Sequence, residues 1–308
     1  MTVLYKSDPV RGAVWAELFA SKAPDLPFRM WPDIGNSAEV RYLVTWQLPE
    51  RLEQTFPNLE VVFTIGAGVD QIDFSEVPAH IPIVRMIDPA IIDGMVEYVT
   101  QAVISIQRDL PDYAMLQANR QWRPMPVKAA AETRVGVLGL GSLASAVLER
   151  LVLFKYSCMG WSRSQRNIPD VTCFSGMQGL TEMIRCADIL VCLLPLTDDT
   201  RGILSRTLLE TLPKGASLIQ TGRGPHLDQA ALLDLLASGQ IRNAFLDVTD
   251  PEPLPPDHAL WSHPRVRITP HIASATRPET AFEVVLNNIR RHQAGLGMTG
   301  LVDRDKGY

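Results

Sequence analysis

The sequence predicts an α/β protein with two Rossmann-like or flavodoxin-like domains, each built on a parallel sheet, and two observations support this fold class. Short strands rich in Val, Ile and Phe alternate with helical segments along the chain of 308 residues, as in parallel sheets covered by helices. A glycine-rich turn at residues 139–144, GLGSLA, ends one of these strands and begins a helix. Because this turn comes so late in the chain, we expect a separate α/β domain before it.

The strands fall into two series separated by a long helix. That helix is predicted over residues 91–119 and ends before the segment QWRPMP at 121–126. We expect it to enter the second domain and the amphipathic helix near the C-terminus to return to the first. The expected domain boundaries are therefore 1–99, 100–277 and 278–308, the last segment completing the first domain. The predicted strands are TVLY, FRMW, VRYLVTW, LEVVFTI and IPIVR, then TRVGVLGL, YSCMGW, DILVCLL, ASLIQ, NAFLDV and VRITP.

Composition and charge argue against several classes of function. The formal net charge is −5 and the sequence shows no run of like charges, which is not typical of a nucleic-acid-binding protein. The strongest apolar run, ADILVCLLPL at 187–196, is too short to cross a bilayer, and no signal peptide is evident. The four cysteines show no C-x-x-C spacing. We therefore expect a cytoplasmic protein with reduced thiols, no metal site and no membrane partner.

The glycine turn has the features of a dinucleotide-binding site. Gly139 permits the tight turn, Gly141 lets the backbone approach a pyrophosphate, and Ala144 is small enough for helix and strand to pack closely. Ser142 and Leu143 begin the helix, where exposed N–H groups and the helix dipole favour phosphate. Glycine turns also occur for packing alone, so the prediction depends on the motifs that follow.

The end of the next strand predicts which dinucleotide is bound. In an NAD-binding unit, an Asp or Glu about 20 residues after the turn holds the ribose 2′-hydroxyl. Ser162, Arg163 and Ser164 stand at that point instead, in the segment CMGWSRSQR. A guanidinium flanked by hydroxyls suits a 2′-phosphate; the alternative is a solvated surface arginine. We therefore expect NADPH to be preferred, with NAD possible.

Three polar residues follow successive strands of the second series and predict a hydride-transfer site. Arg223 lies in TGRG, Glu252 in DVTDPEPLP and His271 in TPHIAS, and ligands bind at the carboxyl ends of parallel strands. Reduction of a ketone by a nicotinamide requires a proton donor, and histidine has a suitable pKa. A neighbouring carboxylate would orient the imidazole, and an arginine would polarise the carbonyl. Each residue alone has a structural alternative, but their order behind the glycine turn favours catalysis.

The remaining histidines lack such a setting. We interpret them as structural residues; they are His80, His226, His258, His263 and His292.

Together the motifs resemble the D-isomer-specific 2-hydroxyacid dehydrogenase family over nearly the whole chain. Within it the sequence is most similar to the glyoxylate/hydroxypyruvate reductase A subgroup. Two departures are TGRG in place of the commoner N-x-x-R-G, and the Pro225-His226 pair where small or aliphatic residues are usual; neither removes a catalytic group. The motifs are GAGVD (66–70), VGVLGLGSLASAV (135–147), LLPLTDDTRGIL (193–204), TGRG (221–224), LDVTDPEPLP (246–255) and TPHIAS (269–274) for the family, and VTWQLPE (44–50), WSRS (161–164), LWSHPRVRITPHIA (260–273) and VDRDKGY (302–308) for the subgroup.

The resemblance implies an active site in the cleft between a substrate domain, made from both chain ends, and a central NAD(P)-binding domain. It also implies a homodimer joined through the nucleotide-binding domains. The residues it assigns are Arg223, Glu252 and His271 for catalysis; Trp46 and the N–H groups of Ala67, Gly68 and Val69 for substrate binding; and Pro195, Thr200 and Asp247, with the residues of the glycine turn, for cofactor binding.

From these features we expect an NADPH-preferring reductase that converts glyoxylate to glycolate and hydroxypyruvate to D-glycerate. A D-2-hydroxyacid dehydrogenase for a bulkier 2-oxo acid is the alternative enzyme. An alternative of another class is a protein that senses NAD(P)H without catalysis, similar to corepressors on this fold. The lack of disordered extensions and of a basic face argues against the sensor.

Overall fold

The computed structural model describes residues 1–305 and 307 and divides the chain into two compact units. The smaller unit comprises residues 1–91 and 275–308, and the larger one comprises Ile92–Ser274. The boundaries expected from sequence, after residues 99 and 277, lie a few residues further along. Within the C-terminal motif VDRDKGY, residues 306 and 308 lie outside the described residues. Each unit contains one sheet whose strand pairs are all parallel, which confirms the predicted fold class.

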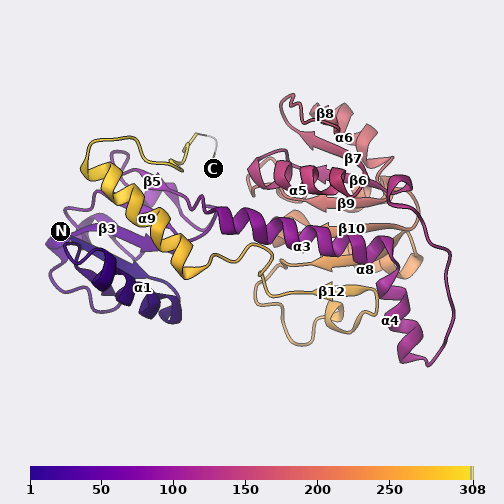
Figure 1. Cartoon of the computed structure of the whole chain (residues 1–308), viewed down its shortest axis with the longest axis horizontal. Helices are drawn as coiled ribbons and strands as arrows, with labels where there is room; N and C mark the ends of the chain where they lie inside the picture. The colour runs from indigo at the N-terminus through magenta and orange to yellow at the C-terminus, as the bar shows by residue number, and fades with distance from the viewer. Residues whose placement is uncertain (306, 308) are drawn as a thin grey trace. The chain divides into compact units, whose positions relative to one another are not determined.

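The smaller unit has a five-stranded sheet in the order β2-β1-β3-β4-β5, the order of flavodoxin-like folds. Helix α9 lies beside α1 (Figure 1), and the Phe282 ring meets Phe19 edge-on with a centroid separation of 4.9 Å. This contact attaches the returning C-terminal segment to the N-terminal one. The elements are β1 (Thr2–Lys6), α1 (Pro9–Lys22), β2 (Phe28–Met30), η1 (Ser37–Glu39), β3 (Val40–Thr45), α2 (Leu52–Thr55), β4 (Val61–Thr64), η2 (Phe74–Glu76), β5 (Ile83–Val84) and α9 (Pro278–Gln293).

The larger unit has a seven-stranded sheet in the order β12-β11-β10-β9-β6-β7-β8 (Figure 1). The chain order reverses direction between β6 and β9, which is the switch point at which Rossmann folds bind ligands. The elements are α3 (Pro89–Gln107), α4 (Leu110–Ala118), η3 (Ala130–Glu132), β6 (Arg134–Leu138), α5 (Ser142–Leu153), β7 (Ser157–Ser162), β8 (Thr172–Ser175), α6 (Gly176–Ile184), β9 (Ile189–Cys192), α7 (Arg206–Thr211), β10 (Ala216–Gln220), η4 (Gly224–His226), α8 (Gln229–Ser238), β11 (Ile241–Leu246), η5 (Ala259–Ser262) and β12 (Val266–Ile268), and α3 begins within the smaller unit.

Two details differ from the sequence-based expectation. The single helix predicted over 91–119 is two helices, because Asp109 takes a left-handed backbone conformation (φ 56°) between α3 and α4 and Pro111 lies in the first turn of α4. Strand β8 was not predicted. It is four residues long and lies at the edge of the sheet, so it lacks the apolar run that marks a strand buried on both faces.

Both faces of the larger sheet are buried, as alternation along β9 shows. Ile189 and Val191 pack with residues of α3 and α5, whereas Leu190 and Cys192 pack in the other core cluster with residues of α6 and α8. Polar side chains therefore collect at the two ends of the strands. No helix among the described residues is both long and apolar enough to span a bilayer.

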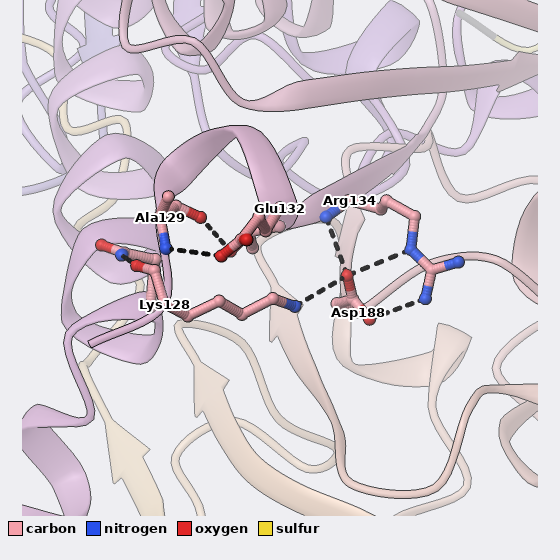
Figure 2. A network of polar contacts seen from close by, with 7 residues as sticks. Lys128, Ala129, Glu132, Arg134 and Asp188 are labelled. Atoms are coloured by element: carbon pink, nitrogen blue, oxygen red, sulfur yellow. Dashed lines mark hydrogen bonds and ion pairs between the residues drawn. The ribbon is translucent and has the colours of Figure 1, made fainter. Parts of the chain in front are cut away.

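A polar network stabilises the amino-terminal ends of the central strands. The carboxylate of Asp188, just before β9, accepts hydrogen bonds from the backbone N–H, Nε and Nη2 of Arg134 at 2.9–3.1 Å. Lys128 Nζ donates to the same carboxylate at 3.3 Å, and Glu132 accepts from the Ala129 N–H beside it (Figure 2). Partial burial alone would raise the pKa of Asp188, but these hydrogen bonds and positive charges lower it below its usual value.

Substitution Asp188→Asn should therefore lower stability in a pH-dependent way without altering catalysis. A carboxyl whose pKa is depressed by folding stabilises the protein above its unfolded pKa, and this contribution disappears as the pH falls through the folded pKa. We expect a loss of about 1 kcal/mol near neutral pH, because the basic partners are half exposed. The difference in thermal unfolding between wild type and variant should shrink below about pH 4. A difference that is constant with pH would contradict this assignment.

Candidate active site

The residues predicted for catalysis lie in loops that follow β10, β11 and β12. These strands are parallel neighbours, so the loops at their carboxyl ends share one edge of the sheet. His271 Nδ1 lies 2.9 Å from Glu252 Oε2, and the structure thus joins two of the three predicted residues directly. The side chains of this pair are 36% and 39% exposed, so a ligand can reach them.

The orientation of His271 leaves one ring nitrogen available for chemistry. Nδ1 is bound to Glu252, and among the described residues Nε2 has no hydrogen-bond partner. The other oxygen of Glu252, Oε1, accepts the N–H of Thr249 at 3.1 Å. Both carboxylate oxygens are therefore engaged, which fixes the imidazole and leaves Nε2 open, and the predicted role of His271 as proton donor stays a prediction.

The turn that carries His271 is held by a buried aspartate. The carboxylate of Asp247, which is 2% exposed, accepts the Thr269 hydroxyl at 2.6 Å and the N–H groups of Ile272 and Ala273 at 2.9 Å. The N–H of His271 donates to the backbone oxygen of Asp247 at 2.9 Å. These bonds hold His271 in a left-handed conformation (φ 55°), which histidine tolerates better than most residues. The expected contact of Asp247 with a nicotinamide remains a prediction.

Arg223 is held by hydrogen bonds of its backbone and by the close packing of the glycine that follows it. Its N–H donates to His226 Nδ1 at 3.0 Å, and its carbonyl accepts Gln220 Nε2 at 2.9 Å. A Cβ on Gly224 would stand 1.9 Å from the carbonyl oxygen of Thr249, a distance that only glycine permits. The loops that carry Arg223 and Glu252 are therefore in direct backbone contact.

The electrostatics of the site favour an ionised Glu252. Partial burial alone would raise the pKa of this carboxyl. Hydrogen bonds from His271 and the Thr249 N–H, together with the positive charges of His271 and Arg223, outweigh burial and lower the pKa below its usual value.

The glycine turn has the geometry that a dinucleotide needs. Gly139 adopts φ +97°, and a Cβ there would approach the Leu193 carbonyl oxygen at 3.0 Å, so the fold itself requires this glycine. Gly141 has φ −81°, and a Cβ there would meet nothing within 4 Å. Packing within the chain therefore does not explain Gly141, and its predicted contact with a pyrophosphate stays a prediction. Ser142 and Leu143 form the first turn of α5 directly behind it.

At the end of β7, Arg163 forms an ion pair that the sequence did not predict. Arg163 Nη1 lies 2.8 Å from Asp199 Oδ2, and the two side chains are 66% and 72% exposed. The hydroxyl of Ser162 donates to the carbonyl of Ser164 at 2.7 Å, which shapes the loop. Arg163 is thus accessible and already bound to an anionic oxygen, the kind of group that a 2′-phosphate presents.

The segment after β9 is joined to the Arg223 loop. The Pro195 carbonyl accepts the Thr200 hydroxyl at 2.7 Å and faces His226 Nε2 at 3.3 Å. Pro195 and Thr200, both predicted cofactor residues, are therefore fixed relative to each other. Among the described residues, no group of three or more His, Cys, Asp or Glu side chains is arranged to hold a metal ion.

In the smaller unit, the predicted substrate-binding residues also lie together. The ring of Trp46, at the end of β3, lies against Gly66, where a Cβ would be 3.0 Å from the ring. Gly66 begins the turn that contains Ala67, Gly68 and Val69, and the Thr64 hydroxyl donates to its carbonyl at 2.9 Å. In the part of the chain that the structure describes, the N–H groups of Ala67, Gly68 and Val69 have no acceptor.

Sequence reasoning missed two residues that contact the predicted site residues. Asp199 was overlooked because a pair of exposed charges on different loops leaves no local pattern. Thr249 contributes a backbone N–H, which no side-chain motif reveals. His226, the least certain of the histidines interpreted as structural, is buried and accepts the Arg223 N–H, which agrees with a structural role in this loop.

Comparisons with known proteins agree with this geometry. Residues 100–273 match the family model for the NAD-binding domain of D-isomer specific 2-hydroxyacid dehydrogenases. The chain is 36% identical to glyoxylate/hydroxypyruvate reductase A of Yersinia enterocolitica over 314 residues, which cover 100% of both proteins.

Two solved structures are similar over nearly the full length. One is a D-isomer specific 2-hydroxyacid dehydrogenase from Xanthobacter autotrophicus Py2 in complex with NADPH and MES, with 37% identity, a TM-score of 0.93 and 99% coverage of both chains. The other is an NADPH-dependent glyoxylate/hydroxypyruvate reductase from Sinorhizobium meliloti in complex with NADP and sulfate, with 30% identity, a TM-score of 0.92 and coverage of 100% of this chain and 99% of that one.

The parallel sheets, the glycine turn and the Arg-Glu-His arrangement define a nicotinamide-dependent oxidoreductase. The chain belongs to the D-isomer specific 2-hydroxyacid dehydrogenase family, and within that family it is similar to the glyoxylate/hydroxypyruvate reductases.

Substitution Gly141→Ala should weaken dinucleotide binding by about tenfold or more and leave the fold intact, because the added Cβ occupies space that the chain itself does not use. Gly139→Ala should instead lower the melting temperature. Gly297→Ala, another open glycine position, serves as the control. Binding is measured by quenching of protein fluorescence or by calorimetry with NADPH. Wild-type affinity in Gly141→Ala would refute this role of the glycine.

Proposed function

We propose that the protein reduces small 2-oxo acids with NADPH, converting glyoxylate to glycolate and hydroxypyruvate to D-glycerate. The observation that carries the proposal is the His271–Glu252 pair, whose open Nε2 lies at the edge of the sheet where Arg223 is fixed. The substrates named for the relatives from Yersinia enterocolitica and Sinorhizobium meliloti support the choice of 2-oxo acid.

Each residue of the site has a distinct task in this reaction. The bound dinucleotide supplies the hydride that the keto carbon accepts. Arg223 polarises the carbonyl and neutralises charge that develops on its oxygen. His271 then transfers the Nε2 proton to that oxygen, which completes the hydroxyl group, and Glu252 stabilises the imidazolium before the transfer.

The residues of the smaller unit that were predicted to bind substrate are of types that suit a carboxylate and a small substituent. We propose that the N–H groups of Ala67, Gly68 and Val69 bind the substrate carboxylate, because backbone N–H groups that converge in a turn attract anions. The indole of Trp46 would then limit the size of the substituent on the keto carbon. This arrangement favours substrates the size of glyoxylate and hydroxypyruvate over bulkier 2-oxo acids.

The proposal is tested by steady-state reduction of a panel of 2-oxo acids. His271→Ala should lower kcat about 10²- to 10⁴-fold, and Trp46→Ala should improve the relative activity toward bulkier acids. His263→Ala, outside the site, is the control. Undiminished turnover by His271→Ala would disprove the catalytic assignment, and wild-type protein that binds NADPH but reduces no 2-oxo acid would indicate a sensor.

The preference for NADPH is proposed to depend on Arg163. When the 2′-phosphate binds, it would replace Asp199 as the partner of the guanidinium. The Ser164 hydroxyl would add a hydrogen bond, and the Ser162 hydroxyl would add another after it releases the Ser164 carbonyl. The NADPH and NADP complexes of the two similar structures support this choice of cofactor.

Arg163→Ala should therefore reduce the ratio of kcat/KM for NADPH to that for NADH by about tenfold or more. Asp199→Asn, which removes the competing carboxylate but keeps the size of the side chain, should maintain or increase that ratio. The NADPH-to-NADH ratio of both variants is measured at the same ionic strength, so that the loss of the guanidinium can be compared with the loss of the competing carboxylate. An unchanged ratio in Arg163→Ala would overturn this explanation of cofactor choice.

We further propose that the protein is a cytoplasmic homodimer joined through the larger unit. Large apolar side chains of this unit, among them Trp122 and Leu153, are exposed, and family resemblance favours a dimer. The four cysteines are unpaired, consistent with a reducing compartment. Light scattering of the purified protein measures its molar mass and so distinguishes a dimer from a monomer of 34.1 kDa.

A further inference from the structure

His226 is a buried histidine at the junction of two loops of the site. Its side chain is 0% exposed, and its backbone is anchored on both sides. The N–H donates to the Arg223 carbonyl at 3.1 Å, and the carbonyl accepts the N–H of Leu204 at 2.9 Å. The ring also packs against Gly222, where a Cβ would stand 2.8 Å from Nδ1. The imidazole therefore has one position and one orientation.

The neighbours of the ring determine where its proton lies. The Arg223 N–H can only donate, so Nδ1, at 3.0 Å, must accept. The Pro195 carbonyl can only accept, so Nε2, at 3.3 Å, carries the proton. A neutral imidazole with the proton on Nε2 satisfies both groups. Cys192 Sγ lies 3.9 Å from Nδ1, and burial raises the pKa of this thiol to about 12, so it is uncharged.

We propose that His226 is a positioning residue that links the catalytic Arg223 to the cofactor-binding segment at Pro195. This inference rests on the proposed function and adds a residue to it that acts through the backbone of its two neighbours. Nδ1 fixes the arginine loop after β10, and Nε2 fixes the segment after β9. Nδ1 therefore affects the 2-oxo acid through Arg223, and Nε2 affects the dinucleotide through Pro195.

Because the two ring nitrogens have different partners, conservative variants can remove one hydrogen bond at a time. The Asn side chain in His226→Asn places an oxygen near the position of Nδ1 and can accept the Arg223 N–H, but it cannot reach Pro195. The longer Gln side chain in His226→Gln places an amide N–H near the position of Nε2 and can donate to Pro195, but it loses the first bond. His226→Leu removes both. His258→Asn is the matched control, because His258 Nδ1 also accepts a backbone N–H, from Leu260 at 3.2 Å, but caps η5 outside the site.

The expected result is a split between the two ligands. His226→Asn should keep kcat for glyoxylate near that of wild type and weaken NADPH binding about tenfold, and His226→Gln should do the reverse. His226→Leu should show both defects, and His258→Asn neither. NADPH affinity is measured by calorimetry without turnover, so inactivity of the wild type toward all 2-oxo acids would count against the proposed function and leave the cofactor half of the test readable. Equal losses in the Asn and Gln variants, or a fall in melting temperature with both parameters at wild-type values, would overturn the positioning role.

Discussion

The catalytic geometry depends on the buried carboxylate of Asp247. It accepts three hydrogen bonds from the turn at residues 269–273, which support the left-handed conformation of His271 together with the bond from the His271 N–H to the Asp247 backbone oxygen. An isolated carboxylate at this depth would be costly, but one that accepts a hydroxyl and two N–H groups is satisfied. The aspartate therefore acts before any ligand binds, because it holds His271 within reach of Glu252.

The second level of organisation comes from the parallel sheet. Neighbouring strands β9, β10, β11 and β12 deliver the segments of Pro195, Arg223, Glu252 and His271 to one edge, while the Asp188 network stabilises the opposite edge. Each loop is then joined to the next: His226 links the first two, Gly224 packs on Thr249 to link the second and third, and Glu252 binds His271. The site is thus a chain of contacts across four loops.

Much of this was predictable from sequence, because buried strands and glycine turns leave local patterns. Apolar runs located β9 and β10, and residues such as Arg223, Glu252 and His271 stood directly after strands. The break at Asp109 and the edge strand β8 were not predictable in this way, since the first depends on one backbone angle and the second on a partly exposed surface. Asp199 and Thr249 were missed because their partners are distant in sequence or are backbone groups, which composition and spacing do not encode.

The contact between Gly224 and the Thr249 carbonyl has a consequence for engineering. Since no side chain fits at residue 224, mutational libraries directed at the Arg223 loop would mainly yield proteins with a displaced arginine. The turn at 66–70 is constrained less severely, since a Cβ on Gly66 would stand 3.0 Å from the Trp46 ring. A library for the Arg223 loop should therefore keep glycine at residue 224.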